Sequence, residues 1–192
     1  MKTHHPYFSA LTPKVVDFFS AEDEDLIFKD IQVHIEEVRR LFEWPGIPYH
    51  DEAEEAHSKF NRWCWHNLPV LTAMHHGDMM RDKVMDLVEM DMKPSYNFLS
   101  MYGDDGVCPP HTDRPQCMLT IDVCVDQDAT WPIYIKSDGA FKSYTLTPGQ
   151  ALIYSGTYQE HYRKPMQEDS TATFCNMAFF HFVTEDFMGA LS

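Results

Sequence analysis

The pattern of apolar and polar residues changes near residue 93. Before that point, apolar residues recur at steps of three and four, the period of an amphipathic helix. The clearest such stripe comprises Leu26, Ile27, Ile31, Ile35, Val38, Leu41 and Phe42. Beyond it, short runs of alternating apolar and polar residues are separated by Gly, Pro, Asp and Asn, as in strands joined by turns. The pattern therefore predicts helices followed by a β-rich region.

Three helical regions are expected in the first half. A short helix is predicted over residues 13–19, with Pro13 at its first position. The apolar stripe forms the second helix, which Ser20 and the acidic residues after it would cap. A third helical zone extends over residues 51–90 and is broken near Pro69 and Gly77, because proline and glycine interrupt a helix.

Six strands are expected in the second half: Ser95–Met101, Met118–Val125, Trp131–Ser137, Phe141–Leu146, Ala151–Tyr154 and Thr171–Val183. In residues 118–125, an apolar set alternates with a more polar one that includes Thr120, Asp122 and Cys124. Such a strand would turn its apolar face to helices and its other face to a partly polar interior.

These elements predict an α+β fold, with a small barrel or sandwich braced by N-terminal helices. With no internal repeat, low-complexity tract or linker in the sequence, one domain is expected over residues 1–192. Residues 1–93 would be mainly helical support, and residues 94–192 would form the β core.

The charge of the chain restricts its partners. The formal net charge is −15, from 30 acidic and 15 basic side chains. A surface of this kind repels phosphate backbones and anionic lipids, so neither nucleic acid nor a membrane is an expected partner. A neutral or cationic small molecule or a basic peptide is compatible, and a local basic pocket still allows an anion. The oligomeric state stays open.

The cysteines indicate the compartment. The five cysteines, at positions 64, 108, 117, 124 and 175, form no CxxC pair, which argues against a disulfide framework or a zinc knuckle. Residues 1–16 lack the continuous apolar core of a secretory signal, and no run is long enough to span a bilayer. We therefore expect a reducing, cytoplasmic location.

The candidate chemistry lies in a turn-rich loop that ends in His111-Thr112-Asp113. If Thr112 is extended, the His111 and Asp113 side chains lie on the same side of the chain. His161, which follows a turn and a predicted strand, would complete two imidazoles and one carboxylate. This set binds iron(II) on one face and leaves the other positions open. A second His-x-Asp pair, His76-Gly77-Asp78, lies in a helix-breaking segment and is interpreted as structural.

Residues 94–183 resemble the core of the iron(II)/2-oxoglutarate-dependent oxygenases, in the neighbourhood of the prolyl-hydroxylase-like members. The matching elements are Tyr102-Gly103, His111-Thr112-Asp113, Pro148 to Tyr154, His161-Tyr162-Arg163-Lys164-Pro165 and the closing strand Cys175–Val183. The resemblance implies a double-stranded β-helix, the jelly-roll fold of the cupins. It also implies a catalytic Fe(II) held by His111, Asp113 and His161, with 2-oxoglutarate and O2 at the open positions. The implied activity is that of a hydroxylase, a dioxygenase that converts 2-oxoglutarate to succinate and carbon dioxide.

The chain departs from that family at the cosubstrate anchor. Many relatives place an Arg or Lys on the closing strand to pair with the far carboxylate of 2-oxoglutarate, but residues 170–174 contain no basic side chain. Because a buried carboxylate needs a partner, Arg163 is the first substitute. Lys136, which strand alternation places beside Tyr134, is the second, and Arg114 is the third.

Other contacts are expected from the resemblance and from the positions of residues in the sequence. Tyr102 is expected to donate a hydrogen bond from its hydroxyl to the cosubstrate. Tyr134, which lies beside Lys136, is expected to contact the cosubstrate as well. Arg114 and Trp131 are expected to contact the primary substrate. That substrate would be a small molecule, such as an amino acid or a specialised metabolite, or a peptide side chain.

Two alternatives stay open. An iron oxygenase or oxidase could work without 2-oxoglutarate if the substrate itself chelates the iron, and the missing base on the closing strand keeps this interpretation in play. A non-catalytic metal-binding β-barrel protein would bind iron without turnover.

Overall fold

The fold is described from a computed structural model of the chain, which places residues 5–19, 28–29, 31–33, 35–36 and 60–191. Its elements in chain order are α1 (Pro6–Ser9), β1 (Lys14–Asp17), β2 (Arg62–His66), α4 (Pro69–His75), α5 (Asp78–Val88), β3 (Met92–Tyr102), β4 (Cys108–His111), β5 (Leu119–Gln127), β6 (Ile133–Ser137), β7 (Ala140–Tyr144), β8 (Gln150–Tyr154), β9 (His161–Arg163), α6 (Met166–Asp169) and β10 (Cys175–Thr184). No helix among these described residues is long and apolar enough to cross a membrane.

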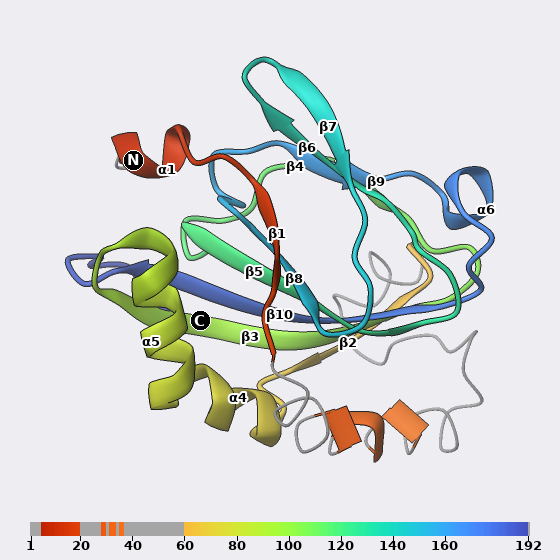
Figure 1. Cartoon of the computed structure of the whole chain (residues 1–192), viewed down its shortest axis with the longest axis horizontal. Helices are drawn as coiled ribbons and strands as arrows, with labels where there is room; N and C mark the ends of the chain where they lie inside the picture. The colour runs from red at the N-terminus through yellow and green to blue at the C-terminus, as the bar shows by residue number, and fades with distance from the viewer. Residues whose placement is uncertain (1–4, 20–27, 30, 34, 37–59, 192) are drawn as a thin grey trace.

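Two antiparallel sheets face each other (Figure 1). The larger one has six strands in the order β1-β8-β5-β10-β3-β2, and the smaller one has four in the order β4-β9-β6-β7. One apolar cluster joins them, because Ile133 and Ile135 of the small sheet pack with Leu152 and Met177 of the large one. Each of the six predicted strands is present with shifted ends.

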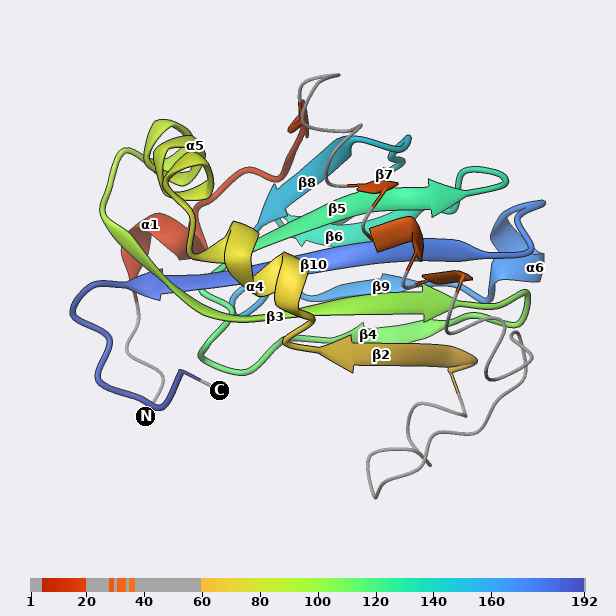
Figure 2. The same cartoon turned by 90° about the horizontal axis from the view of Figure 1, so that it is seen from below.

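The outer face of the large sheet is covered by α4 and α5 (Figure 2). Leu119, Ile121 and Val123 of β5 are fully buried there, with Leu71 of α4 and Met80 of α5. The alternate residues of β5 face the space between the sheets. The predicted division of this strand into a helix-covered face and an inner face is therefore confirmed.

Two predicted helical regions are strands instead. Residues 14–17 form β1, which pairs with β8 in the register Val15↔Leu152, and residues 62–66 form β2, which pairs with β3. β-branched and aromatic residues prefer a pleated surface, and here they outweigh the helix-start signal at Pro13. The large sheet therefore draws two strands from the N-terminal half, which corrects the expectation that residues 94–192 alone form the core.

The other helix predictions have a mixed outcome. The breaks near Pro69 and Gly77 are confirmed, because α4 begins at Pro69 and Gly77 is the N-cap of α5. Most of the predicted helix over residues 26–42 lies outside the described residues. Its described positions, 28–29, 31–33 and 35–36, are helical.

The central strand β10 is irregular next to the candidate site. Its pairing with β3 shifts between Phe180 and Phe182, opposite Pro94, which has no N–H to donate to a ladder. The carbonyl of His181, between the two, instead accepts hydrogen bonds from Ser95 Oγ at 2.9 Å and His75 Nε2 at 2.9 Å. Such bulges redirect a side chain, and here the side chain is that of His181.

Candidate metal centre and its pocket

Three potential ligands meet where the small sheet begins. His111 ends β4 and lies opposite His161 at the start of β9, and Asp113 follows two residues after His111. One ligating atom from each of the three side chains lies within 4.8 Å of the others. The separations are 3.3 Å from His111 Nε2 to Asp113 Oδ1 and 3.8 Å from His161 Nε2 to the same oxygen. Residues far apart in the sequence thus form one compact donor set.

Backbone carbonyls orient both imidazoles. His111 Nδ1 bonds to the carbonyl of Pro109 at 2.7 Å, and His161 Nδ1 bonds to that of Gln159 at 2.9 Å. Since a carbonyl only accepts, each Nδ1 carries the proton and each Nε2 has its lone pair free when the ring is neutral. Bonds of this kind fix the tautomer and orientation of metal-binding histidines.

The charges on this set suit a cation. Burial raises the pKa of Asp113, but its hydrogen bond to His111 and the nearby His161 lower it to about 2. Burial lowers the pKa of His111, whereas its hydrogen bond to Asp113 raises it to about 11. Asp113 is therefore ionised at neutral pH, and a metal ion that binds here displaces a proton from His111.

Gly156 lies directly against the Asp113 carboxylate. A Cβ atom at Gly156 would overlap Asp113 Oδ2 and lie 2.8 Å from Thr120 Oγ1. The backbone N–H of Asp113 also donates to the carbonyl of Gly156 at 2.8 Å. The turn after β8 therefore packs directly against the Asp113 carboxylate, and only glycine at position 156 leaves room for that carboxylate.

The donor set opens onto a pocket of about 440 Å³ between the two sheets. This volume lies within the usual range for a small-molecule site. Burial defines a deep end and a mouth. Tyr102, Asp122, Tyr154 and Arg163 line the deep end and are at most 4% exposed. His66, His111 and Arg114 line the mouth and are exposed.

Arg163 is a buried cation at the deep end. Its Nη1 donates to the carbonyl of Trp131, its Nη2 lies 4.0 Å from Met177 Sδ, and its guanidinium lies 4.8 Å from the Trp131 ring centroid. These contacts hold the side chain in place, and no ion pair joins it to a carboxylate among the described residues. A buried cation of this kind favours an anionic ligand.

Asp122 and Tyr154 form an acid and hydroxyl pair beside it. The Tyr154 hydroxyl donates to Asp122 Oδ2 at 3.1 Å, while Asp122 Oδ1 is buried without a protein partner among the described residues. Burial raises the pKa of Asp122 to about 8, although Arg163 acts in the opposite direction. The carboxyl group is therefore mainly protonated at neutral pH, and its O–H can donate a hydrogen bond into the pocket.

The raised pKa of Asp122 makes the stability of the fold depend on pH. In the unfolded chain this carboxyl ionises near pH 4, whereas in the folded protein it stays protonated to about pH 8. The folded state thus binds the extra proton, and stability falls as the pH rises between these values. Asp122→Asn removes the titrating carboxyl group. Between pH 5 and pH 8, the free energy of unfolding of the wild type should therefore fall by roughly 2–4 kcal/mol relative to that of the variant, because each pH unit is worth about 1.4 kcal/mol. Urea unfolding of both proteins at the two pH values measures this difference, and parallel pH profiles would contradict it.

The structure places two of the other predicted site residues in the pocket. Tyr102 is buried at the deep end, where its hydroxyl accepts a hydrogen bond from Arg62 Nη1 at 3.3 Å. Arg114 lies at the mouth, with its guanidinium 3.9 Å from the centroid of the Tyr96 ring. The positions of both residues suit the contacts expected of them.

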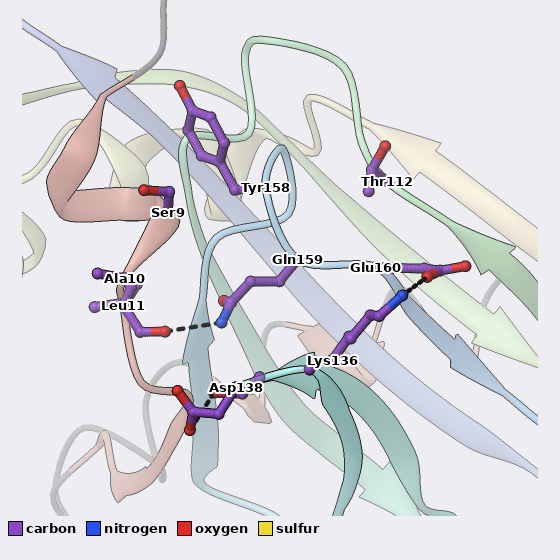
Figure 3. Close-up of a pocket in the computed structure, with 11 residues that line it drawn as sticks. Ser9, Ala10, Leu11, Thr112, Lys136, Asp138, Tyr158, Gln159 and Glu160 are labelled. Atoms are coloured by element: carbon purple, nitrogen blue, oxygen red, sulfur yellow. Dashed lines mark hydrogen bonds and ion pairs between the residues drawn. The ribbon is translucent and has the colours of Figure 1, made fainter.

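Lys136 and Tyr134 point away from the pocket. On β6, Ile133 and Ile135 face the interior, so the alternate side chains face outward. Lys136 pairs with Glu160 at 3.1 Å beside a second hollow of about 430 Å³ (Figure 3). The Tyr134 hydroxyl donates to Asp169 Oδ2 at 2.8 Å. The cosubstrate contacts expected of these two residues are therefore wrong in this geometry.

The substrate contact expected of Trp131 is also wrong, because Trp131 lies in the core. It is 1% exposed, and its Nε1 donates to the carbonyl of Lys164 at 3.1 Å. Its ring packs edge-on against Tyr102, with centroids 5.0 Å apart. Trp131 is therefore a core side chain that packs against Arg163 and Tyr102, as large aromatic residues commonly do.

Several pocket residues were not predicted. Asp122 belongs to the polar inner face of β5, so the alternation of that strand was the available signal. His181 lines the pocket, shares a hydrogen bond with Thr120 Oγ1 at 3.2 Å and leaves Nε2 without a protein partner among the described residues. Its position depends on the irregular pairing of β10, which no local pattern indicates. Phe98 and Phe179 also line the pocket.

Comparison with known proteins identifies the fold. No family model matches the chain, and neither does any curated protein. HygX from Streptomyces hygroscopicus, solved with nickel and 2-oxoglutarate bound, aligns with a TM-score of 0.64 at 11% identity, over 94% of this chain and 85% of that one. A 2OG-Fe(II) oxygenase family oxidoreductase from Burkholderia pseudomallei aligns with a TM-score of 0.64 at 10% identity, over 93% and 87%. A prolyl-4-hydroxylase from Pseudomonas putida aligns with a TM-score of 0.59 at 11% identity, over 88% and 92%. The chain therefore has the fold of these oxygenases, as the sequence predicted.

Proposed function

We propose that the chain is a non-haem iron(II), 2-oxoglutarate-dependent oxygenase that hydroxylates a small molecule or a peptide side chain. The observation that carries the proposal is the convergence of His111, Asp113 and His161 within 4.8 Å at a pocket of small-molecule size. The neighbours of the same fold include HygX with nickel and 2-oxoglutarate bound, which supports this choice of metal type and cosubstrate.

The donor set fits iron(II). Two neutral imidazole nitrogens and one carboxylate are the ligands of non-haem iron oxygenases, which keep further positions open for other ligands. His111 Nε2, His161 Nε2 and Asp113 Oδ1 would be the three donors. Iron(II) bound there would supply the activation of O2, with one oxygen atom going to succinate and the other to a substrate C–H bond.

The deep end of the pocket fits the far carboxylate of 2-oxoglutarate. Arg163 would pair with it, in place of the base that relatives carry on the closing strand. The protonated Asp122 and the hydroxyl of Tyr102 are the nearby donors, and Tyr154 holds Asp122 in place. Burial of these four residues excludes water from the ion pair and strengthens it.

The cysteines support a reducing compartment, and we propose the cytoplasm. All five lie in the described part of the chain, and all are free thiols. The Cys117 sulfur lies 3.0 Å from the hydroxyl of Tyr96 at the edge of the pocket. A reducing environment would keep such thiols, and bound iron(II), in the working oxidation state.

The experiment separates metal binding, cosubstrate binding and turnover. The protein is loaded anaerobically with iron(II), and 2-oxoglutarate is added while the visible absorption of the complex is followed. Oxygen is then admitted and succinate is measured. A new charge-transfer band followed by succinate supports the proposal. If iron binds but 2-oxoglutarate changes neither the spectrum nor the succinate yield, substrate chelation without the cosubstrate or plain metal storage is the better interpretation.

Arg163→Ala is expected to raise the concentration of 2-oxoglutarate needed for half-saturation by roughly 30-fold or more. Loss of one partner of a buried charge pair costs at least about 2 kcal/mol, and about 1.4 kcal/mol corresponds to a factor of ten. Lys136→Ala should leave this concentration unchanged, because that lysine bonds to Glu160 outside the pocket. The anaerobic titration measures both variants, and Arg163→Gln repeats the test with less loss of volume. Equal effects at the two positions would contradict the assignment of Arg163.

A further inference from the structure

The proposed function assigns no ligand to the mouth of the pocket. In the proposed function, the cosubstrate occupies the deep end around Arg163, and the three donors hold the metal. The remaining lining among the described residues comes mainly from β2, β3 and β10, together with Arg114 after β4. It is therefore the part of the pocket that meets the primary substrate.

Aromatic side chains form this lining. Phe98 of β3 and Phe179 of β10 are direct neighbours across the sheet, with ring centroids 4.5 Å apart and planes within 12°. Tyr96 is nearly parallel to Phe98, and its ring lies 4.4 Å from His181. His66 contacts the Phe98 ring at 5.3 Å. We call Tyr96, Phe98 and Phe179 the aromatic row.

The row extends outward from the metal centre. A nitrogen of His181 lies within 4.8 Å of a carboxylate oxygen of Asp113, and the rings of Tyr96, Phe98 and Phe179 follow at 4.4, 5.7 and 6.4 Å from that histidine. All three rings are half-buried, although residues of this type usually bury themselves more fully. Phe98 and Phe179 stack on each other, and all three rings line the pocket, so the row offers an aromatic surface to a ligand.

The charge of the lining is opposite to that of the chain. The net charge of the protein is −15, yet the described residues that line the pocket include three arginines, Arg62, Arg114 and Arg163, and two aspartates, Asp113 and Asp122. Asp122 is mainly protonated, and a bound divalent metal ion would add further positive charge. Arg62 and Arg163 belong to the deep end, so Arg114 is the arginine of the described lining that a substrate at the mouth would meet.

We propose that the primary substrate carries an aromatic ring and a carboxylate or another anionic group on a short spacer. The substrate ring would lie against the aromatic row, and its anionic group would pair with Arg114. This inference rests on the proposed function, because it assigns the deep end to the cosubstrate. It excludes polycationic substrates, which the arginines repel, and places the spacer carbons next to the metal centre.

The test measures binding without turnover. The protein is loaded with nickel and saturated with 2-oxoglutarate under the conditions of a calorimetric titration. Three ring acids are titrated in: 3-phenylpropanoate, indole-3-acetate and phenylalanine. Each is compared with two counterparts: one in which a cyclohexyl group replaces the aromatic ring, and an amide that lacks the carboxylate charge. We expect at least one ring acid to bind roughly tenfold or more tightly than both of its counterparts.

Variants then assign the contacts. Phe98→Leu and Phe179→Leu should each weaken binding of that ring acid about 2- to 10-fold, the effect of one aromatic contact. Arg114→Gln should weaken it about 10-fold or more, the effect of a charge-assisted hydrogen bond. The matched controls are Phe141→Leu, since Phe141 is 40% exposed on β7, and Arg81→Gln, since Arg81 is exposed on α5. Neither control should change the affinity.

The outcomes also separate this inference from the proposed function. If 2-oxoglutarate binds but no ring acid exceeds its cyclohexyl and amide counterparts, the substrate class is wrong while the oxygenase proposal stands. The same conclusion follows if the three variants bind the ring acid as the controls do. If 2-oxoglutarate itself does not bind to the nickel protein, the proposed function fails first.

Discussion

Asp113→Ala is expected to abolish succinate formation and to lower the affinity for iron(II) by more than about 100-fold. Asp113 supplies the carboxylate of the donor set, and its oxygen lies 3.3 and 3.8 Å from the two imidazole Nε2 atoms. Without it, only two neutral imidazole nitrogens are left to hold a divalent cation. Loss of a residue that merely orients a ligand already costs about 10- to 100-fold in metal affinity, so loss of a ligand costs more. Metal content after dialysis and succinate yield are the measurements.

A matched control lies in the other His-x-Asp sequence. Asp78→Ala removes the same side chain from His76-Gly77-Asp78, where the carboxylate is exposed and pairs with Arg81 at 2.7 Å. An exposed pair of this kind contributes at most about 1 kcal/mol, so iron content and succinate yield should match the wild type. If Asp113→Ala keeps iron while Asp78→Ala loses it, the metal centre has been assigned to the wrong pair.

Gly156→Ala is expected to lower metal affinity about 10- to 100-fold, although position 156 donates no ligand. The added methyl group falls on Asp113 Oδ2, so the carboxylate must rotate or the turn must move. The effect should equal that of losing an orienting partner. Some stability is lost as well, about 1–3 kcal/mol for an overpacked site. Competition with a metal chelator measures the affinity, and a thermal melt measures the stability.

Gly139→Ala separates the two effects. Gly139 has a φ of +80° in the turn between β6 and β7, and a Cβ there meets no atom within 4 Å. Alanine is strained in that conformation, so this variant should lose stability and keep its metal affinity. If both glycine variants keep the metal equally well, the turn after β8 does not set the position of Asp113.

Two of the three metal donors could be predicted because their signal is local, whereas His161 lies far along the chain. His111 and Asp113 are two residues apart in an extended segment, so strand geometry alone puts their side chains together. The anchor could be predicted only as a set of alternatives. Arg163 and Lys136 are both basic residues, and their difference lies in the alternation of β9 and β6, which turns one side chain inward and the other toward Glu160.

The remaining pocket residues depend on long-range pairing. Phe98 meets Phe179 only because β3 and β10 are adjacent in the large sheet, and His181 enters the pocket at an irregular step between those strands. Likewise, the local sequence at Lys14 to Asp17 predicts the start of a helix, but pairing with β8 makes this segment a strand. Strand propensity depends strongly on context of this kind, so these contacts could not be predicted from local sequence patterns.

Under the proposed function, the difference in depth between Arg163 and Arg114 would set the order in which the ligands bind. A ligand held by Arg163 must pass the mouth to reach its site, and a ligand held by Arg114 blocks that passage while it is bound. 2-Oxoglutarate should therefore add before the primary substrate, and the oxidised product should depart before succinate. Steady-state kinetics would then show a compulsory order, in which excess primary substrate traps the free enzyme and inhibits competitively against 2-oxoglutarate.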